Sequence, residues 1–403
     1  MKAVVWCGVG DIRLEDVAEP QIKEPTDAII RITTSAICGT DLHLVRGTMP
    51  GMQDGTILGH EAIGIVETTG SAVRGFTKGD RVVVCSTIGC GTCSYCRAGY
   101  YAQCDKANPN GPLAGTSFFG GPEATGPVDG LQAEFARIPF AATTLVKVPD
   151  SVSDEEAILV SDILPTAWFG SRLAQVSTGD TVLVLGAGVV GQCAIASAKR
   201  QGASRVLVVD GIASRLQMAR RQNAEVINFN TEDPVAMVHE LTGGIGVDRV
   251  IEAVGVDAER PAKGPAADEL PLSESDFDDE QRNAAPGAKP QGDTWVPGDA
   301  PSLALRWATK AVAKAGTIGI IGVYPPTFDA FPIGEAMNRN LTIQGGNCNH
   351  RRYVPKLLSM VARGDIDLTP FITQLRGPEN VLDAYERFDR RDEGWVKTVL
   401  AMS

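Results

Sequence analysis

The stretch Val182–Gly191 reads VLVLGAGVVG and decides the fold of the second half of this 403-residue chain. Four apolar residues are followed at once by Gly-x-Gly-x-x-Gly and then by a helical pattern. A strand, a glycine turn and a helix in this order are typical of a dinucleotide-binding sheet, because the glycines let backbone N–H groups approach a pyrophosphate. The predicted pyrophosphate-binding residues are Gly186, Gly188, Val190 and Gly191.

An acidic residue follows the glycine motif at the expected distance. Asp210 stands nineteen residues beyond Gly191 and closes the next apolar run. A carboxylate there accepts hydrogen bonds from the adenosine ribose and would repel a 2′-phosphate, which predicts NAD rather than NADP. Arg215 either stacks on the adenine side or is an exposed helix cation.

Strand and helix patterns alternate from about residue 171 onward. Helical stretches lie between several apolar runs, for example at Val189–Arg200 and Ser214–Gln222. This alternation predicts an α/β domain with a doubly wound parallel sheet. The predicted strands are Thr181–Leu185, Arg205–Asp210, Val226–Phe229, Asp248–Ala253, Thr317–Ile321 and Leu341–Gln344.

The first ~160 residues have a different character, with short β-branched runs separated by turn residues. Examples are Ala28–Ile32, Gly64–Glu67 and Asp80–Val84, which predict a compact, mostly β domain. Near the end of the chain, Tyr353–Gly364 has the pattern of an amphipathic helix and Trp395–Leu400 that of a closing strand.

One segment, 256–300, fits neither pattern. It has eleven acidic and four basic residues, so it supplies −7 of the net charge of −12, and it holds six prolines and four glycines. A connection this long is expected to be either functional or disordered. If the segment is functional, the hypothesis is that it forms a lid over the adenosine end of the cofactor. The chain would then re-enter the fold around Pro301–Leu303.

Charge and hydropathy exclude several classes of protein. The acidic balance argues against nucleic-acid binding, which needs a basic surface. The N-terminus lacks the pattern of a signal peptide, and no apolar run approaches the ~18 residues of a membrane helix. We therefore expect a cytoplasmic protein whose nine cysteines bind metal or are buried rather than form disulfides.

Four cysteines form the most specific motif in the chain. Cys90, Cys93, Cys96 and Cys104 follow the spacing Cys-x2-Cys-x2-Cys-x7-Cys in a loop of small residues. Four thiolates from one loop match a closed tetrahedral zinc site. The spacing departs from the iron–sulfur motif of bacterial ferredoxins. Because all four positions are filled, the predicted zinc is structural.

A second group of metal-binding residue types lies upstream, at positions 36–43 and 58–61. A lone Cys or His is usually a packed core residue. Here one Cys, two His, one Asp and one Glu fall within 24 residues of a chain with four histidines. A further carboxylate, Asp162, stands just before the predicted nucleotide-binding domain.

The motifs Cys-Gly-Thr-Asp-x-His (38–43) and Gly-His-Glu (59–61), the four-cysteine loop and the glycine motif occur in this order. Together they resemble the zinc-containing medium-chain alcohol dehydrogenase family over essentially the whole chain. The resemblance implies a GroES-like, mostly β catalytic domain and a Rossmann NAD-binding domain. Expected bounds are 1–165 and 346–403 for the first domain, and 166–345 for the second, with the acidic insertion at 256–300.

The resemblance also implies a catalytic zinc bound by Cys38 and His60, with Glu61 as a nearby or exchanging ligand. Asp162 stands where many members have a cysteine, and this departure resembles the branch of glutathione-independent formaldehyde dehydrogenase and formaldehyde dismutase. A thiolate and a carboxylate neutralise Zn²⁺, and three protein ligands leave a position open for water or an alcohol. Asp41 is suited to orient a zinc-ligating imidazole.

By the same resemblance, the Thr40 hydroxyl contacts the substrate oxygen and passes its proton through the cofactor ribose to His43 near the surface. Val254 and the segment 322–324 end later strands, where the nicotinamide lies in the family. The remaining residues expected at the cofactor are Gly39, Thr40, His43, Val254, Pro301, Leu303, Gly322 and Tyr324.

The predicted reaction is oxidation of a small alcohol or aldehyde hydrate, with formaldehyde as the first candidate. Alternatives are formaldehyde dismutation with a retained cofactor, a general alcohol or polyol dehydrogenase, and a non-catalytic zinc- or cofactor-binding regulator. Members of the family that the chain resembles are usually homo-oligomers, so we expect a homo-oligomer, with a tetramer preferred. Phe118, Phe119 and Trp168 either narrow a pocket or are core aromatics. His350 has no assigned role, and Arg351 or Arg352 is a candidate for contacting pyrophosphate.

Overall fold

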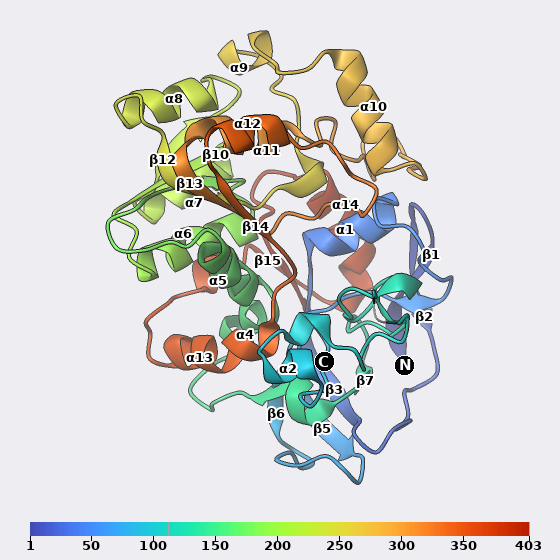
Figure 1. Cartoon of the computed structure of the whole chain (residues 1–403). Coiled ribbons are helices and arrows are strands. Elements are labelled where there is room, and N and C mark those ends of the chain that lie inside the picture. The colour runs from blue at the N-terminus through green and yellow to red at the C-terminus, as the bar shows by residue number, and fades with distance from the viewer. Residues whose placement is uncertain (112, 403) are drawn as a thin grey trace. The chain divides into compact units, whose positions relative to one another are not determined.

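A computed structural model of the chain describes residues 1–111 and 113–402 (Figure 1). These residues form two compact units, and the chain crosses from one unit to the other more than once. The first unit consists of 1–165, 287–296 and 347–403, and the second unit consists of 166–286 and 297–346.

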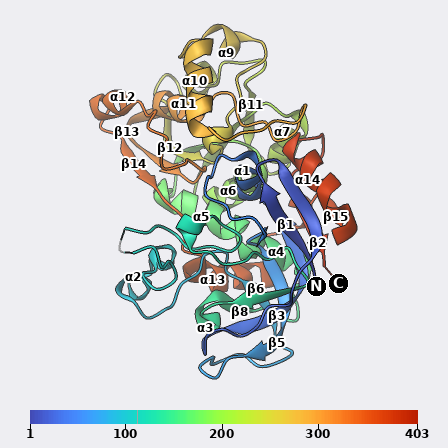
Figure 2. The same ribbon diagram turned by 90° about the vertical axis from the view of Figure 1, so that its right-hand side faces the viewer.

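The first unit is built around antiparallel β-structure (Figure 2). Its central strand β3 (Ala28–Ile37) pairs on one side with β5 (Ala62–Thr69), and its alternating isoleucines Ile30 and Ile32 are fully buried. The larger sheet has the order β15 (Gln374–Arg376), β16 (Thr398–Ala401), β3, β5, β6 (Arg81–Val84) and β8 (Leu145–Lys147), with β7 (Phe135–Ile138) also paired to β3. The smaller sheet joins β2 (Asp11–Asp16), β1 (Lys2–Gly8) and β4 (Thr56–Ile57).

Helices of the first unit cover these sheets. Two of them carry candidate site residues at their ends: α1 (Gly39–Arg46) begins just after Cys38, and α4 (Asp154–Ser161) ends just before Asp162. The α4 helix starts at a capping box between Ser153 and Glu156, which satisfies its first free N–H groups. The others are α2 (Ser94–Arg97), α3 (Ala141–Thr144), α13 (His350–Ala362) and α14 (Val381–Asp389), and α5 (Ile163–Leu173) continues into the second unit.

The second unit has the predicted doubly wound α/β architecture. Six strands, all parallel, are arranged in the order β11-β10-β9-β12-β13-β14. They are β9 (Thr181–Leu185), β10 (Arg205–Asp210), β11 (Glu225–Asn228), β12 (Val247–Glu252), β13 (Val312–Ile320) and β14 (Thr342–Gly345). Helices α6 (Val189–Arg200), α7 (Ala213–Arg221), α8 (Pro234–Leu241), α11 (Leu303–Ala311) and α12 (Ile333–Asn338) connect or flank them.

The acidic insertion departs from one part of its sequence interpretation, whereas the lid over the cofactor stays a prediction. It contains two helices, α9 (Pro265–Asp268) and α10 (Glu274–Ala284), so the expectation of a disordered excursion is wrong. Phe277 anchors α10 in the core of the second unit and is fully buried. One aromatic residue among many acids gave no hydrophobic period, which is why the sequence pattern did not reveal this helix.

Residues 287–296 of the insertion group with the first unit. There the backbone N–H of Trp295 donates to Oδ2 of Asp389 at 2.6 Å, and the Trp295 side chain lies in the hydrophobic core. Gln291 Nε2 donates to the carbonyl of Gly10. At the second boundary, Gly346 belongs to the second unit rather than the first.

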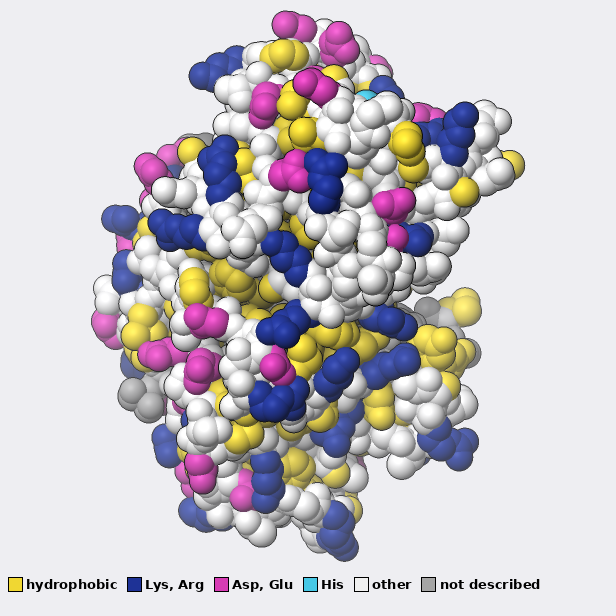
Figure 3. Space-filling model, turned by 90° about the vertical axis from the view of Figure 1, so that its left-hand side faces the viewer, with side chains coloured by type: hydrophobic (Ala, Val, Ile, Leu, Met, Phe, Trp, Pro, Cys, Tyr) yellow, Lys and Arg dark blue, Asp and Glu magenta, His cyan; other side chains and the backbone are white. Residues whose placement is uncertain are grey.

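Among the described residues, no helix has both the length and the apolar character that a membrane span requires. The face in Figure 3 exposes lysine and arginine side chains together with aspartate and glutamate side chains. Several exposed ion pairs between such groups, including Lys2–Asp16 and Arg13–Asp11, lie on the first unit.

Candidate metal and cofactor sites

Cys38 occupies the N-cap position of α1, with extended backbone that turns the chain from β3 into the helix. Its backbone N–H donates to Oδ2 of Asp41 at 2.9 Å. This bond satisfies one of the free N–H groups at the helix start and fixes the thiol direction. The Cys38 side chain is buried.

His60 reaches the same place from the turn before β5. Gly59 in this turn has a φ of 92°, and a Cβ there would lie 2.5 Å from Cγ of Gln132, so only glycine fits. Nδ1 of His60 lies 3.2 Å from Oδ1 of Asp41, and Nε2 lies 3.6 Å from Oδ2 of Asp162. The imidazole therefore directs Nε2 toward the other candidate ligands.

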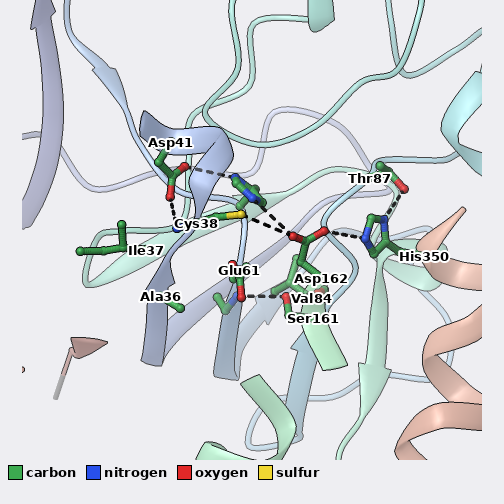
Figure 4. Close-up of polar contacts among 12 residues, drawn as sticks. Ala36, Ile37, Cys38, Asp41, Glu61, Val84, Thr87, Ser161, Asp162 and His350 are labelled. Atoms are coloured by element: carbon green, nitrogen blue, oxygen red, sulfur yellow. Dashed lines mark hydrogen bonds and ion pairs between the residues drawn. The ribbon is translucent and has the colours of Figure 1, made fainter. Parts of the chain in front are cut away.

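Asp162 lies between α4 and α5, with Oδ2 3.8 Å from Sγ of Cys38 (Figure 4). Its neighbour Ser161 fixes the backbone, since its Oγ donates to the carbonyl of Val84 and accepts the N–H of Ala62. Burial acts to raise the pKa of Asp162, but hydrogen bonds from His350 and His60 outweigh it and hold the pKa well below its ordinary value. The carboxylate is therefore present in its charged, ligating form.

Glu61 lies behind these residues in a buried ion pair with Lys397, whose Nζ also donates to the carbonyl of Ile37 at 3.0 Å. Burial raises the pKa of Glu61 to about 7, with Lys397 acting in the opposite direction. Glu61 Oε2 is buried and has no hydrogen-bond partner among the described residues. A buried acceptor without a partner is costly, so this oxygen is suited to a cation.

The donor set matches zinc. Ligand atoms of Cys38, His60, Glu61 and Asp162 all lie within 4.8 Å of one another, and all four residues are buried. One sulfur, one imidazole nitrogen and carboxylate oxygens are donors that Zn²⁺ accepts. Burial raises the pKa of the Cys38 thiol, so a thiolate at this position needs a cation beside it.

The four cysteines of the loop 90–104 also come together, with their sulfur atoms within 4.8 Å of one another. Backbone N–H groups point at the sulfurs, for example from Cys90 to Sγ of Cys104 at 3.2 Å and from Cys93 to Sγ of Cys90 at 3.3 Å. None of the nine cysteines, all of which are described, forms a disulfide. Sulfurs clustered without disulfides and surrounded by N–H donors match a closed thiolate metal site.

In the second unit, the glycine motif forms the turn between β9 and the first turn of α6. Gly186 has a φ of 88°, and a Cβ on Gly191 would lie 1.9 Å from the carbonyl oxygen of Gly186. The helix therefore packs against the turn only because residue 191 is glycine. A Cβ on Gly188 would lie 4.0 Å from a guanidinium nitrogen of Arg215, so this half-buried cation stands beside the turn.

Asp210, at the end of β10, is tied to the glycine turn. Its carboxylate accepts the N–H of Ala187 at 2.7 Å and the N–H of Ile212 at 2.8 Å. Each carboxylate oxygen keeps a second lone pair for another donor. Asp210 thus holds the turn in place, in addition to the ribose contact that the sequence suggested.

Val254, Gly322 and Tyr324 follow the neighbouring strands β12 and β13, and Glu252 joins these two strand ends. Its Oε1 accepts the N–H groups of Val254 at 2.8 Å and Gly255 at 2.7 Å. A Cβ on Gly322 would lie 2.3 Å from the Gly255 nitrogen, so the two loops touch. Glu252 is fully buried and was missed, because its contacts are to backbone groups that no sequence motif reports.

Other predicted residues lie elsewhere than expected. His43 is buried at 3% exposure, not near the surface, because this face of α1 packs inward. Leu303 is fully buried in the core of the second unit, and its neighbour Pro301 is also buried. The Arg351 guanidinium donates to the carbonyl of Leu145 within the first unit, and Arg352 lies over the ring of Tyr353.

The aromatic candidates separate clearly. Phe118 is half-buried and meets the ring of His60 edge-on, at a centroid distance of 6.1 Å. Phe119 is fully buried in the core of the first unit, and Trp168 is buried in the second unit. Phe118 therefore stands beside the candidate metal site of the first unit. Gly39 is exposed and Thr40 half-buried at the start of α1.

Comparisons with known proteins identify the family of the chain. Residues 24–150 match the alcohol dehydrogenase GroES-like domain, and residues 189–261 match the zinc-binding dehydrogenase domain. An uncharacterized zinc-type alcohol dehydrogenase-like protein of Bacillus subtilis, AdhB, is 37% identical over 404 residues, covering 99% of this chain and 100% of the relative.

A solved structure, alcohol dehydrogenase TADH from Thermus sp. ATN1, matches with a TM-score of 0.80 and 31% identity, with 100% of both chains covered. The glutathione-independent formaldehyde dehydrogenase of Bacillus subtilis is 36% identical over 279 residues, which cover 64% of this chain and 67% of that protein. The likeness to the formaldehyde-oxidising branch is therefore partial, whereas the wider family likeness extends over the whole chain. The chain belongs to the zinc-type medium-chain alcohol dehydrogenase family and is an oxidoreductase of that family.

Proposed function

We propose that this enzyme uses zinc and NAD to oxidise a small alcohol or aldehyde hydrate, with hydrated formaldehyde as the first substrate to test. The observation that carries the proposal is the buried donor set of Cys38, His60 and Asp162 in a chain that also has a nicotinamide-type glycine turn. Hydrated formaldehyde is a gem-diol and is chemically an alcohol.

Sγ of Cys38, Nε2 of His60 and Oδ2 of Asp162 would hold the catalytic zinc, and Glu61 Oε2 is a further oxygen within reach. Bound zinc would polarise the substrate hydroxyl, and bound NAD would accept hydride from the carbon. The negative charges of Cys38 and Asp162 would balance the charge of the metal. The four cysteines of the loop 90–104 would hold a second, structural zinc.

Oxidation of the hydroxyl group releases one proton, for which α1 offers a route. Thr40 and His43 are three residues apart on this helix, so they lie on one face. We assign the Thr40 hydroxyl to the substrate oxygen and the His43 imidazole to the next proton transfer. The proton would pass from Thr40 to His43 through the cofactor ribose, and because His43 is buried the final transfer to water needs a further carrier.

Two features support the choice of NAD and of a small substrate. The Asp210 carboxylate is placed at the end of β10 and would repel the 2′-phosphate of NADP. Phe118 meets His60 edge-on and limits the room beside the candidate ligands. Formaldehyde is the first compound to test for two reasons. Asp162 stands where many family members have a cysteine, and the chain is partly similar to a formaldehyde dehydrogenase.

The test is product stoichiometry from isotopically labelled formaldehyde, read by NMR, with zinc-loaded protein, NAD and no added thiol. Formate matched by NADH is the expected result. Formate matched by methanol, with little free NADH, would instead establish dismutation. If neither product forms but other alcohols reduce NAD, the substrate choice is wrong. If no alcohol or aldehyde is turned over, the proposed function as a whole is wrong.

A further inference from the structure

His350 is a buried histidine that the proposed reaction does not use, yet it lies against a candidate metal ligand. It is the first residue of α13, is 2% exposed, and its Nε2 lies 2.7 Å from Oδ1 of Asp162. An ionised carboxylate only accepts hydrogen bonds, so Nε2 carries the hydrogen. Figure 4 shows Asp162 between Cys38 on one side and His350 on the other.

The two oxygens of Asp162 therefore have different surroundings. Oδ2 faces Sγ of Cys38 at 3.8 Å and Nε2 of His60 at 3.6 Å, whereas Oδ1 is taken by His350. A carboxylate ligand differs from a thiolate in having two donor atoms, either of which can bind a metal. The hydrogen bond to Oδ1 fixes the orientation of the carboxylate, so that Oδ2 is the oxygen that faces the other candidate ligands.

The His350 ring is itself held in place. Its Nδ1 lies 3.0 Å from Oγ1 of Thr87, and this hydroxyl donates its hydrogen to the carbonyl of Cys348 at 3.1 Å. Thr87 is buried, so both ring nitrogens of His350 are engaged away from solvent. A ring fixed at both nitrogens cannot turn away from Asp162 without losing a buried hydrogen bond.

The backbone before α13 is anchored as well. The Asn347 side chain donates to Oγ1 of Thr116 at 2.7 Å, and Oδ1 of Asn349 accepts the N–H of Ala102 at 2.9 Å. Ala102 lies inside the four-cysteine loop, between Cys96 and Cys104. The loop that would hold the structural zinc thus supports the segment that carries His350.

We propose that His350 is a positioning residue for the catalytic metal, which fixes the Asp162 carboxylate in the orientation that turns Oδ2 toward the zinc. This inference rests on the zinc site proposed above. Hydrogen bonds to metal-ligating groups typically change metal affinity by 10–100-fold when they are removed. The prediction therefore concerns how tightly the metal is held, apart from any effect on turnover.

The experiment measures the rate at which zinc-loaded protein releases zinc to an excess of a chromogenic chelator. In His350→Ala, one zinc per subunit is expected to leave about 10–100-fold faster than in wild type. His350→Gln keeps an N–H donor at similar reach and is expected to stay within about threefold of wild type. The matched control is His239→Ala, because His239 contacts the carbonyl of Lys310 in the second unit.

Three results decide the outcome. Fast release in His350→Ala with rescue in His350→Gln, at an unchanged thermal unfolding midpoint, supports the inference. Wild-type release in His350→Ala, or equally fast release in both variants, overturns it. If Asp162→Ala also releases zinc at the wild-type rate, the proposed zinc site itself is wrong, which is a separate failure.

A second variant covers the case in which His350→Ala does not fold. Thr87→Val removes the hydroxyl beside Nδ1 but preserves the shape of the side chain, and it leaves the contact between His350 and Asp162 intact. Zinc release is then expected to be several-fold faster than in wild type. This increase is smaller than the one expected for His350→Ala, which removes the N–H donor altogether. Release at the wild-type rate would overturn the role assigned to the His350 ring.

Discussion

Oδ1 of Asp41 lies 3.2 Å from Nδ1 of His60, while the other oxygen of the same carboxylate accepts the backbone N–H of Cys38 at 2.9 Å. One buried carboxylate thus contacts both residues that the family resemblance assigns to the catalytic zinc. Gln132 Nε2 donates to Oδ2 of Asp41 at 3.2 Å, and Gln132 Oε1 accepts the hydroxyl of Tyr385 at 2.7 Å. This buried network extends from the ligands to α14.

Asp41→Asn is therefore expected to weaken zinc binding at the catalytic site by about 10–100-fold, because the amide loses the charge that orients the His60 imidazole. The measurement is zinc release to a chelator, with one of two zincs per subunit affected. Asp27→Asn is the matched control, since Asp27 is equally buried in the first unit but pairs with Arg137. Equal zinc release in both variants would contradict the role of Asp41.

Gly191→Ala is expected to destabilise the second unit by about 1–3 kcal/mol, because the new Cβ would lie 1.9 Å from the Gly186 carbonyl oxygen. The turn must shift, so NAD affinity is also expected to fall at least ~10-fold. Thermal unfolding without cofactor and NAD titration measure the two effects. Gly188→Ala is the control for stability, since the nearest atom to its Cβ is 4.0 Å away. Equal unfolding midpoints of the two variants would disprove the steric argument.

Asp389→Ala is expected to cost about 3–5 kcal/mol, because it leaves the buried Arg46 guanidinium without its counter-charge. The same change removes the acceptor for the Trp295 N–H and so frees the segment 287–296 from its anchor. Thermal unfolding should shift downward by about 4–10 °C. Asp383→Ala on the same helix breaks only an exposed pair with Arg387, and should change the stability by less than ~0.5 kcal/mol. Similar losses of stability in Asp389→Ala and Asp383→Ala would show that the buried contacts of Asp389 do not stabilise the first unit.

Phe118→Ala is expected to raise kcat/KM for longer primary alcohols relative to formaldehyde by about 10-fold, since one aromatic contact in a pocket is worth ~1–3 kcal/mol. The neighbouring Phe119→Ala should instead lower stability by about 3–5 kcal/mol, because Phe119 is fully buried in the core. Relative kcat/KM values and unfolding midpoints separate the two effects. An unchanged preference in Phe118→Ala would exclude this ring from the substrate pocket.

Most of the fold could be predicted from local sequence patterns. The glycine motif lies directly after β9, and the expected strands of the second unit occur within a few residues of their predicted bounds. Such patterns succeed because a buried parallel strand and the helix after it each leave a signature within about a dozen residues. The candidate metal ligands were equally visible, since three of the four lie within 24 residues.

Long-range partners of the ligands were not predictable in this way. Lys397 meets Glu61 because β16 pairs with β3 in a register that sets Thr398 opposite Ile37. His350 meets Asp162 across 188 residues of chain. Neither contact leaves a local pattern, since both depend on strand order and helix placement in the folded first unit. The packing of the segment 287–296 was missed for the same reason, because Trp295 is held by a distant carboxylate.

Zinc content per subunit, measured on purified wild type beside Cys38→Ser and Cys96→Ser, tests the proposed chemistry most directly. Two zincs are expected in wild type, because two separate buried donor sets are present among the described residues. Each variant is expected to retain one zinc, and only Cys38→Ser should lose NAD-linked alcohol oxidation entirely. Two zincs in Cys38→Ser, with oxidation at the wild-type rate, would contradict the assignment of Cys38, His60 and Asp162 as the catalytic metal site.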